Sequence, residues 1–516
     1  MAPGARTPPG TIWAVDPGLP RARHHILGTA PHVRRSASRS KARALQDRSS
    51  SGVTAVNSSR RRALARALGN AFLTADDWTV RPLVASAEAA IGSRPRWLFR
   101  LAREVLAAYP RRPADRPREF ARFIELSPIL QRAIARALAS GQPLRVVSIP
   151  PARTRMAPSR PWPVPELHDA NDLAELLETE HLEWFADVSF RQRRAKPGPL
   201  HHYRYLWTIA ASGRPRLLEA PLPRLKRIQR TLLEQVLAPI PVHPAAHGFA
   251  PGRSAITGAR LHTGAPTVVN LDLASFFTTV SAGRIYGIFR TAGYPEPVAH
   301  LLTGLCTTRS PVRVISAMPR STGDHNEIRS RLRSPHLPQG APTSPALANL
   351  AALALDRRLA GLAASIGLTY TRYADDLTFS GDLSDRAAIR LIGGVERIVR
   401  AEGFSVQPAK TRVRHAFQRQ VVNGIVVNER PNLTRAEYDQ LKALLHNAVR
   451  LGPDSQNRDQ HGDFRAHLLG RIAWATQLHP ERGQRLRAAF DRIEWPADQL
   501  NRVTASRSTS AAAARE

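Results

Sequence analysis

Cysteine, lysine and acidic residues are all scarce in this sequence of 516 residues. A single cysteine, Cys306, excludes an intrachain disulfide framework and any cysteine-rich zinc module. Only five of the 75 basic residues are lysines, and the 41 acidic residues leave a formal net charge of +34. So large an excess is unusual for an enzyme of small metabolites, and it indicates a polyanionic partner such as a nucleic acid.

Long apolar runs are also missing. The most apolar stretch, 346–368, is interrupted by Asp356, Arg357 and Arg358, so it cannot span a bilayer. A secretory signal has a charged start followed by an apolar run, and the beginning of this sequence has no such pattern. We therefore expect a soluble, cytoplasmic protein with no membrane partner.

Composition divides the chain into five segments. Residues 1–60 are rich in Pro, Ser, Gly and Arg, which predicts a disordered basic arm, the alternative being a tail without function. Apolar residues at helical spacing predict a helical accessory region over 61–155. Strands alternating with helices predict an α+β domain over 165–430, and helical periodicity returns over 431–500. Residues 501–516 are expected to be a disordered tail.

The strands expected in the α+β domain are short runs rich in β-branched and aromatic residues. They cover 203–209, 217–219, 268–273, 368–373, 377–380 and 421–427.

Two of these runs are separated by a pair of adjacent acids, Asp375 and Asp376. The spacing predicts a hairpin, and two carboxylates at its tip repel each other unless a cation lies between them. Such a pair on its own is more often a solvated turn. A third acid, Asp272, ends another apolar run, where burial is costly unless the carboxylate is paired or binds a metal.

Three oxygen donors without histidine or cysteine nearby suit Mg²⁺ or Mn²⁺ rather than zinc. Two such ions can activate an attacking hydroxyl and stabilise a leaving pyrophosphate. Together with the positive net charge, these acids predict a nucleotidyltransferase that acts on nucleic acid.

Four motifs in the expected order resemble those of reverse transcriptases. The Tyr-Ala-Asp-Asp sequence at 373–376 resembles their active-site box, and 270–277 resembles the motif with the first catalytic aspartate. Residues 337–345 resemble the Gly-Pro loop and helix beneath template and nucleotide, and 403–411 resemble the later motif that carries a lysine. Each motif is weak alone, but four in order are a specific signal.

The chain resembles bacterial retron reverse transcriptases in particular, over about 165–490. The stretch 203–254 is similar to their fingers region. Gly258 lies where the family has the Asn of an Asn-Ala-x-x-His element, and Asn423 lies where it has the Thr of Val-Thr-Gly. Because these elements are associated with recognition of the cognate RNA, the two departures concern partner specificity rather than polymerisation.

The resemblance implies a catalytic centre and a fold. Asp272, Asp375 and Asp376 would bind two Mg²⁺ ions, with the backbone carbonyl of Leu273 as a further ligand. Lys410 would assist the departing pyrophosphate as a cation or general acid. The fold would be a right-hand polymerase, with fingers and an antiparallel palm sheet in the α+β domain followed by a helical thumb.

Further roles are implied for residues that contact nucleotide. Phe277 would clash with a 2′-hydroxyl and select deoxynucleotides, its alternative being a core aromatic. Gln339 would contact the nucleotide near its sugar. Arg214 and Arg216 would bind the triphosphate, although in so arginine-rich a chain either could be an ordinary surface residue.

Three residues are implied in RNA binding: His262, Asn423 and Gly424. A lone histidine on a helix is as often a packing residue, so for His262 the two interpretations are close.

The family implies Mg²⁺-dependent synthesis of DNA on a structured non-coding RNA that is both template and primer. Synthesis would begin at the 2′-hydroxyl of an internal guanosine and leave branched RNA–DNA (msDNA). The family also implies a role in antiphage defence with an effector protein. The alternatives are a group II intron-like or CRISPR-associated reverse transcriptase, or a catalytically idle RNA-binding protein of the same fold.

Overall fold

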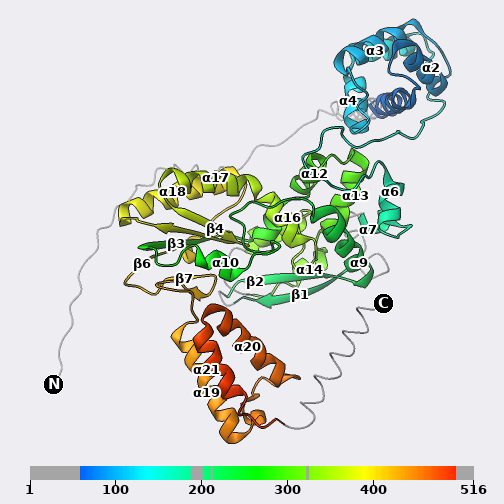
Figure 1. Cartoon of the computed structure of the whole chain (residues 1–516). Coiled ribbons are helices and arrows are strands. Elements are labelled where there is room, and N and C mark those ends of the chain that lie inside the picture. Colours follow the sequence, from blue (N-terminus) through cyan, green and yellow to red (C-terminus); the bar gives the residue numbers. More distant parts are fainter. Residues whose placement is uncertain (1–57, 187–200, 211–212, 321–324, 496–516) are drawn as a thin grey trace, which may run out of the picture. The chain divides into compact units, whose positions relative to one another are not determined.

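The computed structural model describes residues 58–186, 201–210, 213–320 and 325–495, which form the mixture of helices and sheet that the sequence predicts (Figure 1). The chain divides into two units, Met1–Ala63 and Leu64–Glu516. Of the first unit, only 58–63 are described, and they are helical. The disordered segments expected at 1–60 and 501–516 therefore lie outside the described residues, apart from the helical residues 58–60.

The second unit begins with a helical region. Residues 64–74 are helical, and four helices follow: α2 Val80–Ile91, α3 Arg96–Ala108, α4 Pro117–Leu126 and α5 Pro128–Ala139. Their apolar faces form a hydrophobic cluster that includes Phe72, Leu101 and Phe120, all of them fully buried. The stretch between this cluster and the next helix contains neither helix nor strand.

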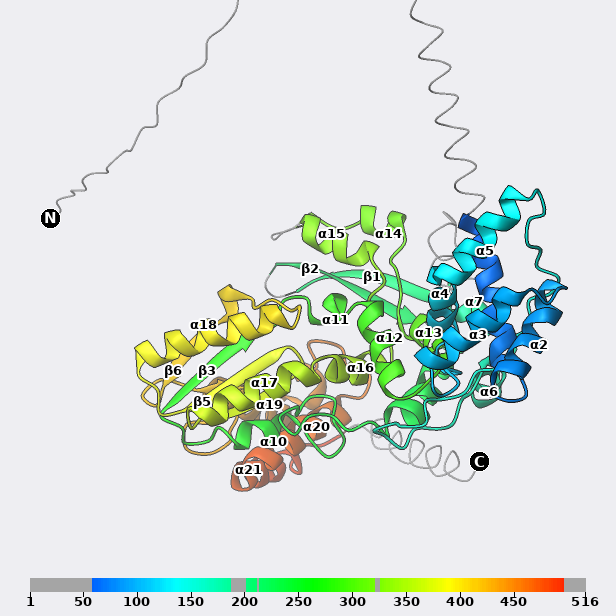
Figure 2. The ribbon, with the colours of Figure 1, turned by 90° about the horizontal axis from the view of Figure 1, so that it is seen from above.

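A four-stranded antiparallel sheet, with strand order β4-β5-β3-β6, lies at the centre of the α+β part. Its strands are β3 Thr267–Asp272, β4 Thr369–Tyr373, β5 Asp376–Gly381 and β6 Arg412–His415. Almost every residue of β3 is buried, as expected for a strand with a neighbour on each side. Helices α17 Leu353–Ser365 and α18 Asp385–Ala401 cover one face of the sheet (Figures 1 and 2).

A second antiparallel pair consists of β1 Tyr203–Ile209 and β2 Pro215–Pro221, and the remaining helices of this part precede and follow it. These helices are α6 Ala170–Leu176, α7 Leu182–Ala186, α9 Pro223–Thr231, η1 Leu232–Leu237, α10 Ala255–Arg260, α11 Phe276–Thr279, α12 Ala282–Thr291, α13 Glu296–Cys306, α14 Val312–Ser316, α15 His325–Arg333, α16 Ser344–Ala351 and η2 Pro408–Lys410. One hydrophobic cluster joins most of them to the central sheet. Cys306 lies inside this cluster, fully buried.

The expected single strand at 421–427 is wrong, because the segment folds as a small hairpin. Its strands are β7 Val421–Val422 and β8 Ile425–Val426. Asn423 and Gly424 form the turn, with φ angles of 52° and 81°. An Asn-Gly pair is the strongest sequence signal for such a two-residue turn, since both positions need a positive φ.

The last described helices pack around their own hydrophobic cluster, which includes Leu445, Leu468 and Phe490. They are α19 Arg435–Leu451, η3 Pro453–Gln456, α20 Phe464–Leu478 and α21 Pro480–Phe490. A capping box between Thr434 and Glu437 fixes the start of α19. Across the described ranges, no helix combines the length and the apolar character needed to cross a membrane.

A buried ion pair connects the central sheet to the helices. Arg372 on β4 is completely buried, and it donates two hydrogen bonds to Asp356 on α17, at 2.8 and 2.7 Å. The same guanidinium donates to the side chain of Asn349 on α16, at 2.9 Å, and to the backbone oxygen of Ala374, at 3.0 Å. The Tyr370 hydroxyl also donates to Asp356, at 2.9 Å, so protein side chains satisfy this buried carboxylate in place of water.

Removal of this arginine alone should destabilise the protein strongly. Replacing Arg372 by Met leaves the Asp356 carboxylate buried without its cation, so we expect the unfolding free energy to fall by about 3–5 kcal/mol. Urea unfolding followed by circular dichroism measures the change. The double variant Arg372→Met/Asp356→Leu removes both charges and should recover part of the loss. A single variant as stable as the parent chain would contradict this account.

Candidate active site

The three aspartates lie together at one end of the central sheet. Asp272 is the last residue of β3, and it faces Asp376, the first residue of β5, in the antiparallel register. Asp375 lies in the turn between β4 and β5, and its backbone oxygen accepts a hydrogen bond from the Leu273 amide at 2.9 Å. A turn and a strand end that are about a hundred residues apart in sequence are thus held next to each other.

The turn that carries Asp375 has a constrained backbone. Ala374 has a φ of 57°, a left-handed conformation that costs free energy in a residue other than glycine. Gly248 lies so close beneath it that a Cβ atom there would come within 2.7 Å of the Ala374 amide nitrogen. Arg372 holds the Ala374 carbonyl from the other side. The position of Asp375 therefore depends on a glycine from the stretch that resembles the fingers region and on a buried arginine of β4.

The pKa values of Asp375 and Asp376 are both raised. Partial burial and the charge of Asp272 raise the pKa of Asp375. Burial and the neighbouring charges of Asp375 and Asp272 raise the pKa of Asp376 to about 7. The Lys410 ammonium lies 2.6 Å from Asp272, and although burial alone would lower the pKa of Lys410, this hydrogen bond raises it. The site thus favours the binding of positive charge.

The donors at this site fit a divalent metal ion. All three are carboxylates, and hard oxygen donors suit Mg²⁺ or Mn²⁺ rather than zinc. Over the ranges that the structure describes, no three acidic, histidine or cysteine side chains are arranged closely enough to enclose an ion. Lys410 donates to Asp272, a carboxylate that would also hold the ion.

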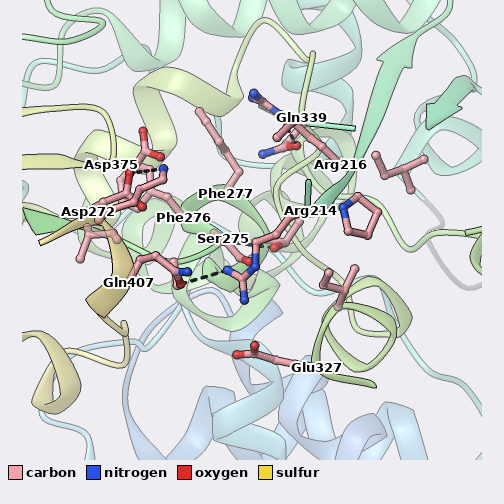
Figure 3. A pocket seen from close by; sticks show the side chains of 18 of the residues that line it. Arg214, Arg216, Asp272, Ser275, Phe276, Phe277, Glu327, Gln339, Asp375 and Gln407 are labelled. Atoms are coloured by element: carbon pink, nitrogen blue, oxygen red, sulfur yellow. Dashed lines mark hydrogen bonds and ion pairs between the residues drawn. The ribbon is translucent and has the colours of Figure 1, made fainter. Parts of the chain in front are cut away.

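A cavity of about 550 Å³ opens beside the aspartates (Figure 3). It is lined by eight of the residues singled out from the sequence: Arg214, Arg216, Asp272, Leu273, Phe277, Gln339, Asp375 and Lys410. Arg216 lies on β2 and Arg214 is the residue just before that strand, opposite the carboxylates. The cavity therefore has an acidic wall and a basic wall.

Two glutamines hold the arginines of the basic wall. Arg214 donates a hydrogen bond to Gln407 and Arg216 donates one to Gln339, each at 3.0 Å (Figure 3). The backbone N–H of Gln407 also donates to the backbone oxygen of Asp272, at 2.7 Å. Sequence reasoning missed Gln407, which connects the two walls although it lies three residues before Lys410 in a motif that was recognised.

Phe277 lies half-buried between the cavity and a neighbouring groove. Its ring contacts Phe276 and Phe249, with centroids 5.7 and 6.3 Å away. Phe276 is the buried member of the pair, packed in the core. The exposed part of Phe277 faces the cavity.

A buried acid–base pair supports the loop of Gln339. Glu219 on β2 is fully buried, accepting a hydrogen bond from Ser310 at 2.7 Å and lying 2.9 Å from His336. The Glu219 amide also donates to the backbone oxygen of Gln339, at 2.7 Å. Burial alone would lower the pKa of His336, but the Glu219 carboxylate raises it. Glu219 lies in the stretch that resembles the fingers region, but its pairing with His336 could not be foreseen, because the two are more than a hundred residues apart in sequence.

His262 lies in the core, which does not fit the direct RNA contact expected for it. The side chain is fully buried, and its two ring nitrogens lie 2.7 Å from Ser380 on β5 and 2.7 Å from Thr371 on β4. Burial and the nearby His247 lower the pKa of His262 to about 4, so the ring is neutral at physiological pH. The histidine therefore connects the two strands of the aspartate hairpin.

The two departures from the retron pattern contact each other. A Cβ atom on Gly258 would lie 3.4 Å from the side-chain nitrogen of Asn423 and 3.2 Å from the Cβ of His247. That nitrogen of Asn423 is buried and has no hydrogen-bond partner among the described residues. Asn423 and Gly424 lie on the β7–β8 turn and do not line the cavity beside the aspartates.

Known proteins match the part of the chain that forms this site. The family model described as reverse transcriptase (RNA-dependent DNA polymerase) matches residues 209–446. This domain implies dependence on a divalent metal. A foamy viral protease-reverse transcriptase solved with double-stranded DNA is 14% identical and has a TM-score of 0.33 over 59% of this chain and 43% of that one. This structural likeness is too low to carry a conclusion.

Curated relatives are more informative. Retron Mx65 reverse transcriptase from Myxococcus xanthus is 43% identical over 56% of this chain and 64% of its own length. Retron Mx162 reverse transcriptase, also from Myxococcus xanthus, is 37% identical over 64% of this chain and 68% of its own. Retron Ec86 reverse transcriptase from Escherichia coli is 31% identical over 57% of this chain and 82% of its own. The chain belongs to the bacterial retron-type reverse transcriptases, a family of RNA-directed DNA polymerases.

Proposed function

We propose that this protein copies RNA into DNA at the cavity beside Asp272, Asp375 and Asp376, with two Mg²⁺ ions, or Mn²⁺ in their place. The observation that carries the proposal is the pairing of an acidic wall with a basic wall across one cavity. A deoxynucleoside triphosphate needs cations at its phosphates and a metal-binding group at the point of bond formation.

Each of the residues at the cavity would have its own role in nucleotide addition. When bound, two divalent ions would activate the attacking hydroxyl and stabilise the departing pyrophosphate. Arg214 and Arg216 would bind the triphosphate through their guanidinium groups. Lys410 would donate a proton from Nζ to the pyrophosphate as it leaves. Phe277 would exclude a 2′-hydroxyl, while Gln339 would orient the sugar.

We further propose that the template and primer are one structured non-coding RNA, and that the product is branched RNA–DNA joined through a 2′-hydroxyl. Similarity to three retron reverse transcriptases supports this. A cytoplasmic role in antiphage defence, with an effector protein as partner, rests on the family resemblance alone. We also propose that α19, α20 and α21 form the thumb, and that Gly424 and Asn423 act in RNA recognition through the hairpin that precedes it.

Substitution of Asp375 by Asn should abolish synthesis and spare RNA binding. The change removes a carboxylate charge without changing side-chain size, so we expect extension of a primed RNA template to fall on the order of a thousandfold or more. Primer extension measures synthesis, and filter binding measures RNA affinity. Asp382→Asn is the matched control, because this exposed aspartate lies just beyond β5. Extension at the parent rate by Asp375→Asn would refute the metal-site assignment.

Shortening Phe277 should weaken sugar discrimination. In Phe277→Ala the ring no longer fills the space beside the incoming sugar, so we expect the preference for deoxynucleotides over ribonucleotides to fall on the order of tenfold or more. Single-nucleotide incorporation with each substrate measures the ratio. Phe417→Ala serves as the control, since that ring is 86% exposed and does not line the cavity. An unchanged ratio would make Phe277 a packing residue only.

The retron product has its own test. Nucleic acid isolated from cells carrying the gene with its flanking DNA should contain a discrete short DNA that shifts on a denaturing gel after ribonuclease and debranching enzyme. Both treatments matter because the RNA is joined to the DNA through a 2′ linkage. If no such DNA forms while the purified protein extends an ordinary 3′ primer, the polymerase proposal stands and the retron product does not.

A further inference from the structure

The helical region that precedes the polymerase domain carries an unusual surface. Residues 64–155 contain 16 arginines, no lysine and seven acidic residues. Several of the acids are engaged locally: Glu125 pairs with Arg122 at 2.7 Å, and Asp115 pairs with Arg116 at 3.3 Å. The remaining positive charge is therefore available to a partner. This region lies outside the stretch that the reverse transcriptase model matches.

A cavity of about 360 Å³ lies between α3 and α5 of this region. Trp97, Ile129 and Leu144 supply its apolar surface, and Arg100, Arg132 and Arg136 supply its charge. No acidic side chain lines it. We call this cavity and its six named residues the arginine groove.

The three arginines of the groove are exposed, and they form no ion pair with any residue of the described ranges. Arg132 and Arg136 are four residues apart on α5, so they point from the same face on successive turns. The distance between these two side chains is comparable with the distance between neighbouring phosphates along one nucleic-acid strand. Arg100 approaches from α3 on the other side of the groove.

Trp97 adds an aromatic surface to this charge. The indole is half-buried and packs against the hydrophobic cluster of the helical region, so its orientation is fixed. A fixed ring beside guanidinium groups is the combination that binds single-stranded nucleic acid, because the ring stacks on a base and the cations contact phosphates. An acidic peptide would use the arginines but gain less from the indole.

We propose that the arginine groove binds a single-stranded segment of RNA, with Arg100, Arg132 and Arg136 on its phosphates and Trp97 against a base. The proposal rests on the proposed function only in taking RNA as the strand that the protein holds. It gives the helical region a function of its own, as a second RNA contact apart from the cavity where synthesis occurs.

The test compares two triple variants of the full chain. One replaces Arg100, Arg132 and Arg136 by Gln. The matched control replaces Arg66, Arg81 and Arg111 by Gln as well. These are exposed arginines of the same region outside the groove. Both variants lose the same charge, so any difference between them reports the location of the arginines and not the net charge.

Binding of a fluorescein-labelled single-stranded RNA of about 20 nucleotides, a length exceeding one typical single-strand site, is followed by anisotropy over a range of salt concentrations. Three lost phosphate contacts should reduce the slope of log affinity against log salt by about 2 and weaken binding on the order of tenfold. The control should keep the parent slope. Equal slopes for the groove variant and the control would overturn the proposal.

Photo-crosslinking with thiouridine-substituted RNA locates the contact. We expect a crosslinked peptide that contains Trp97 in the parent chain and in the control, and none in the groove variant. Crosslinks confined to the polymerase domain would overturn the proposal. A polyglutamate peptide is the second probe: if the groove variant loses peptide binding but keeps RNA binding, the groove receives an acidic protein segment instead of RNA.

The outcome is separable from the proposed function. Asp375→Asn leaves the arginine groove intact, so its RNA affinity and salt slope should equal those of the parent. If that variant still extends primers, the proposed metal site fails while the groove result stands. If the groove variant binds RNA like the parent while Asp375→Asn is inactive, the groove proposal fails alone.

Discussion

The buried pair of Asp356 and Arg372 is the interaction on which the active site depends. Arg372 reaches α17, α16 and the backbone of the aspartate turn at once, so one guanidinium fixes the sheet, two helices and the position of Asp375. A buried ion pair contributes little net stability compared with a well-packed apolar pair. Its value here is positional, because five donors in a rigid plane specify where each acceptor must lie.

Strained backbone conformations also occur around the cavity, where they help to position the aspartates. Ala374, Ser275 and Phe249 all have left-handed φ angles, of 57°, 50° and 57°. Ala374 and Ser275 lie next to the acidic wall, and Phe249 lines the groove beside Phe277. Each such residue costs free energy, which the surrounding packing must offset. Ser275 ends the tight turn that follows Asp272, and Ala374 begins the turn that contains Asp375. The carboxylates repel one another, so it is the backbone that holds them close together.

How far the sequence predicts this protein depends on the range of the interactions involved. The aspartates, Phe277 and Lys410 lie in local motifs, so their positions along strands and turns follow from nearby residues, and eight of the twelve residues singled out line one cavity. His262 shows the limit, because its partners Thr371 and Ser380 lie more than a hundred residues away. The hairpin at 421–427 could have been recognised, since Asn-Gly within a strand-like run is itself a turn signal.

Gly258 and Asn423, the two departures from the retron pattern, lie side by side in the fold. In the sequence the two departures are far apart: residue 258 is glycine in place of the family's asparagine, and residue 423 is asparagine in place of its threonine. In the fold the Asn423 amide lies against the position where a side chain on residue 258 would begin, so a larger residue at 258 would compete for the same space. A left-handed turn position also tolerates asparagine far better than a β-branched threonine. Glycine at 258 therefore leaves room for the Asn423 amide nitrogen, which is buried without a hydrogen-bond partner among the described residues.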